Sequence, residues 1–109
     1  MNAEQFAQTI RIRIGEVARG MLDGSVHYLE GAMELASLRH DVGAYANDQD
    51  FMAFVMVLSR IDDLPVDESR QQWSKEYLVQ YEAEIEEAIE WAKEFSLSQC
   101  QTLAERYSA

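Results

Sequence analysis

The spacing of apolar residues near the start of the chain predicts a helix. Apolar side chains recur at steps of three and four over residues 3–21, which places them on one face of a helix. Residues 10–14 also alternate as a strand would, but the longer register continues on both sides of them, and a helix is therefore expected. Gly24 can adopt a left-handed conformation and end this helix, and Asp23 or Ser25 can cap the next one.

Two shorter helices are predicted in the middle of the chain. From about residue 25 to 40, one stripe of apolar positions is widened by further apolar residues, so this helix is expected to contact two neighbours. Residues 51–58 are all apolar and follow the capping types Asp48 and Asp50, which predicts a short central helix buried on every side. Pro65 prevents its continuation, and Trp73 in the connection over 66–73 is expected to cover an edge of the core.

The last third of the chain is predicted to be helical from about residue 74. Apolar residues follow at steps of three and four as far as Phe95. The segment 96–99 resembles a capping box, so either a new helix begins there, or the same helix bends and continues. The expected architecture is an all-α compact bundle of four to five helices, in a single domain spanning residues 1–109.

The composition narrows the classes of function. The chain carries nine Lys+Arg against twenty Asp+Glu, a formal net charge of −11, so nucleic acid and anionic membranes are not expected partners. Its one cysteine cannot form an internal disulfide, which favours a reducing cytoplasm. Charged residues interrupt the apolar positions of the first thirty residues, so neither a secretory signal nor a spanning helix is predicted.

The predicted last helix is unusually acidic. Seven glutamates and one lysine lie between residues 76 and 94, and four glutamates follow one another at i,i+4, a spacing that destabilises a helix by about 0.2–0.5 kcal/mol per pair. One interpretation is a solvated outer face that keeps the protein soluble. The other is a negative ridge that binds a cationic protein, or the arginines over 11–19 of a second copy. The residues expected to bind such a partner are Glu82, Glu86, Glu87, Glu90 and Glu94.

A second constellation suggests a different class of function. His27, Glu30 and Glu34 share one helical face, and the alternative hypothesis places them in a cleft opposite further polar residues, in a small-molecule-binding or enzymatic bundle. The complete polar cluster is His27, Glu30, Glu34, Arg39, Asp62 and Asp63. This hypothesis requires Glu30 to point inward. Asp62 and Asp63 have a structural interpretation as well, an ion-pair network with neighbouring arginines.

No catalytic, cofactor-binding or metal site is predicted. Di-iron bundles need Glu-x-x-His pairs, and neither histidine follows a glutamate by three residues. Residues 48–50 lack the glycine and the closing glutamate of a calcium loop. Cys100 has no nucleophile motif around it and is expected to be a buried, inert thiol.

Several short stretches resemble a group of small bacterial proteins. The stretches are 29–39, the Phe-x-x-Phe run at 51–54, the Asp-Asp-Leu-Pro turn at 62–65 and Trp73. That group has no assigned activity, so the resemblance implies a bacterial, cytoplasmic helical protein and nothing about catalysis. The group carries an acidic residue where this chain has Arg60, so no shared site is implied at that position.

Three hypotheses of function follow from the sequence. The leading one is a non-enzymatic acidic interaction protein that binds another, basic protein, as bacterial immunity proteins bind a basic toxin, with homodimerisation possible. The alternatives are the polar-cluster bundle and a purely structural homodimer formed through Trp73 and Trp91. Trp91 lies off the apolar stripe of the last helix, which favours an interface position for it.

Overall fold

The computed structural model describes residues 2–43, 48–62, 64 and 74–108. They form four α-helices and one 3₁₀ helix, and no strand occurs among them, so the predicted all-α bundle is confirmed. The elements are α1 (Ala3–Asp23), α2 (Tyr28–Leu38), η1 (Arg39–Val42), α3 (Gln49–Ile61) and α4 (Lys75–Arg106). Trp73, Asp63 and the connection over 65–73 lie outside the described residues.

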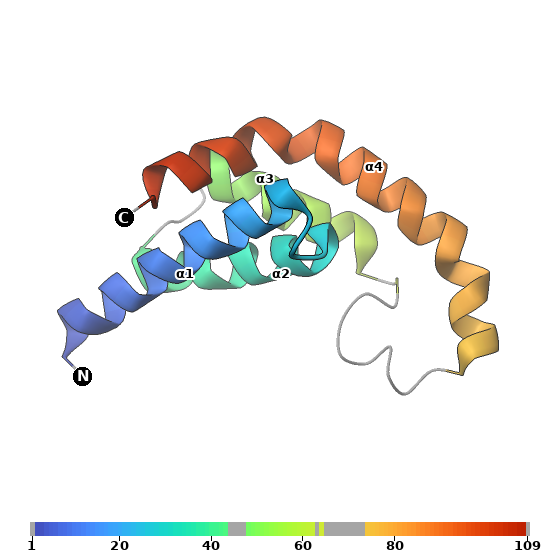
Figure 1. Cartoon of the computed structure of the whole chain (residues 1–109), viewed down its shortest axis with the longest axis horizontal. Helices are drawn as coiled ribbons and strands as arrows, with labels where there is room; N and C mark the ends of the chain where they lie inside the picture. Colours follow the sequence, from blue (N-terminus) through green and yellow to red (C-terminus); the bar gives the residue numbers. More distant parts are fainter. Residues whose placement is uncertain (1, 44–47, 63, 65–73, 109) are drawn as a thin grey trace.

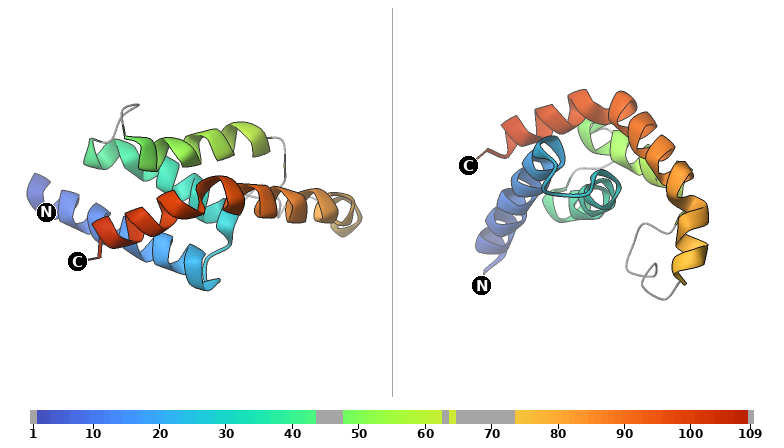
Figure 2. Two further views of the ribbon diagram at one scale, coloured as in Figure 1. Left: turned by 90° about the horizontal axis from the view of Figure 1, so that it is seen from above. Right: turned by 45° about the vertical axis from the view of Figure 1, so that its right-hand side comes forward.

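Helices α1 and α3 each contact both α2 and α4. α1 and α3 both pack against α2 on one side and against α4 on the other, and α4 crosses over the shorter helices as an arch (Figures 1 and 2). The core between them consists of apolar residues from all four helices, including Ile14, Leu29, Leu35, Phe54 and Leu103, each fully buried.

The first helix ends as predicted, whereas the residue that caps the second helix is not one of those predicted. Gly24 has a φ of 89° and its N–H bonds to the Gly20 carbonyl, so the glycine takes the left-handed conformation that ends α1. The cap of α2 is His27, whose Nδ1 accepts from the Leu29 N–H at 3.2 Å. Asp23 instead accepts from the Ser25 N–H at 2.9 Å and shapes the turn before it. The prediction that Asp23 or Ser25 caps α2 is therefore wrong.

The central helix has its predicted cap but is less buried than predicted. It begins after the expected cap, Asp48, whose carboxylate accepts from the Asp50 N–H at 3.2 Å. Phe51, Phe54 and Val57 are fully buried, but the side of α3 that carries Met56 faces solvent, and Met56 is 54% exposed. Burial on every side was therefore a wrong prediction. Its physical reason is that α2 and α4 together cover only part of the circumference of α3.

The last helix is continuous through the segment that resembles a capping box. Ser96 is buried in the middle of α4, and its hydroxyl donates to the Ala92 carbonyl at 2.6 Å. The Tyr28 hydroxyl lies 2.7 Å from the Ser96 Oγ, so Ser96 is satisfied within the core and no new helix starts there. Of the two alternatives from the sequence, the continuing helix is confirmed. Hydroxyl bonds to the carbonyl four residues earlier often accompany helix bending, and α4 curves over the bundle (Figure 1).

No helix among the described residues is both long and apolar enough to cross a membrane.

Candidate functional site: the acidic half of the last helix

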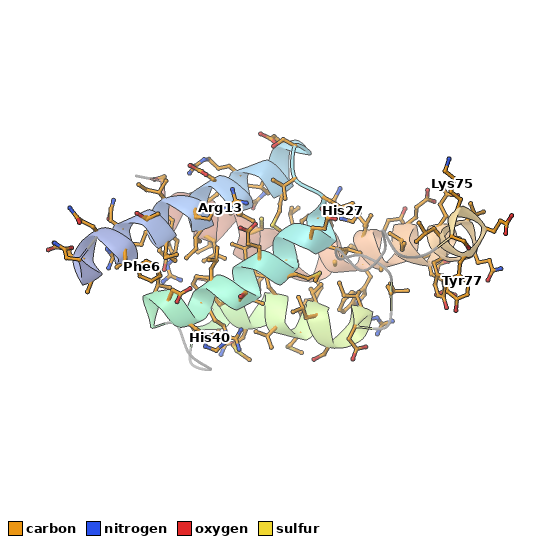
Figure 3. The ribbon with its side chains drawn as sticks, turned by 90° about the horizontal axis from the view of Figure 1, so that it is seen from below. Phe6, Arg13, His27, His40, Lys75 and Tyr77 are labelled. Carbon is orange, nitrogen blue, oxygen red and sulfur yellow. The ribbon has the colours of Figure 1, made fainter. Side chains whose placement is uncertain are left out.

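The two halves of α4 have different surroundings. The second half supplies the buried residues Ala92, Ser96, Cys100 and Leu103, whereas residues 75–90 include no buried residue. The beginning of α4 projects past the ends of the other helices, as Figure 2 shows in its right-hand view, and Lys75 and Tyr77 mark its tip in Figure 3. The other described helices therefore cover only part of the circumference of this half of α4.

The glutamates predicted to bind a partner are all exposed. We call Glu82, Glu86, Glu87, Glu90 and Glu94 the acidic ridge. Within the described part of the chain, none of the five takes part in an ion pair. Lys93, which lies between Glu90 and Glu94 in the sequence, has its Nζ 5.9 Å from the centre of the Tyr28 ring and forms no ion pair with Glu90. The negative charge of the ridge is therefore not neutralised by the part of the chain that the structure describes.

Two arginines of the bundle form ion pairs away from the acidic ridge. Arg13 forms a two-pronged contact with Glu34 of α2, at 2.7 and 2.9 Å, and this hydrogen bonding raises the pKa of Arg13. Arg106 binds Asp48 and Asp50 at 2.9–3.2 Å and so ties the end of α4 to the start of α3. Both pairs stabilise contacts between helices within one chain, and neither involves a glutamate of the acidic ridge.

The residues of the alternative polar cluster do not share a cleft in the described structure. His27 caps α2, Glu34 binds Arg13, and Arg39 donates to the Ala36 carbonyl at the other end of α2. His27 and Arg39 are twelve residues apart on α2 and η1, which corresponds to about 18 Å of helix. Glu30 and Asp62 are exposed, and the inward Glu30 required by this hypothesis is therefore a wrong prediction. Asp63 lies outside the described residues.

Metal-ligating side chains are dispersed over the bundle. His27 and His40 lie toward opposite ends of α2 and η1 (Figure 3). Among the residues that the structure describes, no three His, Cys, Asp or Glu side chains are close enough to hold a metal ion.

Cys100 is fully buried, as predicted. Its thiol donates to the Ala18 carbonyl at 3.4 Å, and burial raises the pKa of the thiol from 9.0 to about 11. Because the thiolate is the reactive form, this environment disfavours nucleophilic chemistry at neutral pH.

The raised pKa predicts a pH dependence of stability. Unfolded chains ionise this thiol near pH 9 while the folded protein keeps it neutral to about pH 11, so its contribution to stability is present below pH 9 and lost between pH 9 and 11. We expect the difference in urea midpoint between wild type and Cys100→Ala to shrink over this range. A constant difference would show that the thiol ionises equally in both states. Wild-type protein should also resist an aromatic disulfide reagent at pH 8 until urea unfolds it.

A groove between α3 and α4 was not expected from the sequence. At its centre the Arg60 guanidinium lies over the indole of Trp91, 4.7 Å from the ring centre, and Phe95 stacks on that indole with ring centres 5.2 Å apart. Trp91 is half-buried against the core, so it is neither a fully buried core residue nor a free surface one. The displacement of Trp91 from the apolar stripe was the one signal in the sequence, but its neighbour Arg60 is thirty-one residues away in the chain.

Comparisons with known proteins add no relative: no family model, no curated protein and no solved structure matches the chain.

Proposed function

We propose that this chain is a non-enzymatic, cytoplasmic interaction protein whose acidic ridge binds a cationic protein. The observation that supports the proposal is the row of exposed glutamates on the projecting half of α4, with no ion pair to any described residue. Immunity proteins that block the nucleic-acid-binding surface of a basic toxin are one class with this electrostatic character.

The energetics of the helix favour a cationic partner. Within the ridge, Glu82, Glu86, Glu90 and Glu94 are spaced at i,i+4, and their three adjacent repulsions destabilise the isolated helix by about 1 kcal/mol in total. A cationic partner removes this repulsion on binding and is attracted over about a Debye length, near 10 Å at 0.1 M salt. A second copy of the chain would instead bring another −11 net charge to the ridge. These two effects favour a basic partner over a homodimer.

The proposal predicts that charge reversal on the ridge abolishes binding. Partners are first isolated by passing bacterial lysate over the immobilised protein and eluting with a salt gradient, and mass spectrometry identifies them. The affinity of the purified partner is then measured for wild type and for the double variant Glu86→Lys/Glu90→Lys. We expect the variant to lose at least about a hundredfold in affinity, because two attractive contacts become repulsive.

The matched control is Glu4→Lys/Glu105→Lys. It changes the net charge by the same amount at two exposed positions outside the ridge, and it should retain most of the affinity. Circular dichroism checks that both variants remain helical. Equal affinity of wild type and the ridge variant, or binding that does not weaken as salt increases, would contradict the proposal.

A further inference from the structure

The groove between α3 and α4 contains two hollows of different chemistry. The first has a volume of about 230 Å³, with an apolar floor of Ile61, Leu64 and Ala88 and the exposed carboxylates of Glu84 and Glu87 at its rim. The second has a volume of about 350 Å³ and lies between Met56, Ser59, Trp91 and Phe95. Arg60 and Trp91 line both hollows, so their contact forms the wall between them.

Large apolar side chains around the second hollow are partly exposed to solvent. Met56 is 54% exposed and Phe95 37% exposed, and together with the half-buried Trp91 they form an apolar patch that continues from α3 to α4. Aromatic residues in a partly desolvated pocket beside a polar rim are the usual centre of a protein–protein interface.

Charge decides what kind of molecule fits the groove. Two carboxylates line the first hollow against one guanidinium, and Glu87 belongs both to this rim and to the acidic ridge. The groove is thus continuous with a strongly negative surface. This surface repels a second copy of this chain and attracts a basic partner protein. The apolar floor of the first hollow suits the aliphatic stem of a lysine or arginine, whose charged end would reach the two carboxylates.

We infer that the α3–α4 groove is the docking site for a basic segment of another protein, which places one Lys or Arg side chain in the acidic hollow and one apolar side chain in the Met56–Phe95 hollow. This inference rests on the proposed function and makes it specific: the ridge attracts the partner, and the groove recognises it. Glu87 and Phe95 are eight residues apart on α4, so the two anchors lie within about 12 Å of each other.

The inference is tested with three fluorescein-labelled helical peptides and fluorescence anisotropy at low salt. The first peptide carries Lys and Leu on one face, the second has Ala in place of every Leu, and the third has Glu in place of every Lys. We expect wild-type protein to bind the Lys/Leu peptide about tenfold or more tighter than the Lys/Ala peptide, because the apolar anchor is buried only in the first complex. The Glu/Leu peptide should not bind.

Two double variants assign this selectivity to the groove. Met56→Ala/Phe95→Ala should bring the two lysine peptides to equal affinity while leaving the Lys/Ala peptide unaffected. Glu84→Gln/Glu87→Gln should reduce the affinity for the Lys/Leu peptide more than Glu82→Gln/Glu86→Gln does, although both double variants remove two charges. Glu82 and Glu86 are suitable controls because, at 3.6 residues per turn, they project on the side of α4 away from Trp91.

The outcomes separate the groove from the ridge. If both lysine peptides bind equally to wild type, the groove is not a docking site, whereas binding by the ridge stands. If only the Lys/Leu peptide binds, the groove inference holds and the ridge alone does not attract cations. Failure of both peptides to bind overturns both proposals, and binding of the Glu/Leu peptide overturns the basic occupant. If the protein alone sediments as a dimer that Met56→Ala/Phe95→Ala dissociates, the groove joins two copies of this chain and the inference is overturned.

Discussion

Replacing Phe54 by alanine is expected to destabilise the protein by about 3–5 kcal/mol, because the phenyl ring is completely removed from solvent at the centre of the bundle. The substitution loses the transfer free energy of the ring and leaves a cavity that the surrounding helices refill only in part. Since domains of this size unfold with about 5–15 kcal/mol, the variant should be close to the limit of folding at 37 °C. Urea unfolding followed by circular dichroism at 222 nm measures the change.

Met56→Ala is the matched control for this prediction. It lies two residues further along the same helix and is 54% exposed, so its truncation should change the free energy of unfolding by no more than about 0.5 kcal/mol. If Phe54→Ala and Met56→Ala destabilise the protein equally, α3 does not present Phe54 to the core, and the packing of α3 in the structure is wrong.

Gly15→Ala is expected to destabilise the protein by about 1–3 kcal/mol, although the same change in an ordinary helix interior stabilises by about 1 kcal/mol. Gly15 is buried where α1 meets the end of α4, and a Cβ atom there would overlap the backbone carbonyl oxygen of Tyr107. That carbonyl cannot easily retreat. The Tyr107 N–H bonds to the Leu103 carbonyl, and the Tyr107 ring packs edge-on against Phe51 with ring centres 6.1 Å apart.

The sign of the effect is the informative part of this prediction. Thr9→Ala, on the exposed side of the same helix, serves as the control and should be neutral or slightly stabilising because alanine has the higher helix propensity. A stabilising Gly15→Ala would show that α1 and the end of α4 are further apart than the structure places them. Thermal unfolding of both variants distinguishes these results.

The leading hypothesis of function depends on the acidic ridge, whose five glutamates all lie within one stretch of the sequence. The glutamates of the acidic ridge are close in sequence and helical spacing places them, so their common exposure followed from the period of the helix. The absence of ion pairs between the ridge and the described residues could not be predicted. It depends on the ion pairs of Arg13 with Glu34 and of Arg106 with Asp48, which join different helices.

The polar cluster shows why the same reasoning failed elsewhere. His27, Glu30 and Glu34 do share a helix, but the cluster also required Arg39 and Asp62 to approach them from other segments. A hydrophobic pattern specifies which face of a helix is buried, and it does not specify which polar groups from other segments meet there. The structure uses His27 for a cap and Glu34 for an ion pair, and leaves Glu30 exposed.

The sequence by itself determined the all-helical architecture, the left-handed turn at Gly24, the cap at Asp48 and the acidity of α4, because each depends on local conformation or on spacing within one segment. Only the tertiary structure decided that α4 runs unbroken through Ser96, since the buried hydroxyl of Tyr28 supplies the partner that makes a buried serine acceptable there. Tertiary structure also created the α3–α4 groove. The contact of Arg60 with Trp91 joins positions thirty-one residues apart, and no periodicity within either helix specifies which residue of the other it meets.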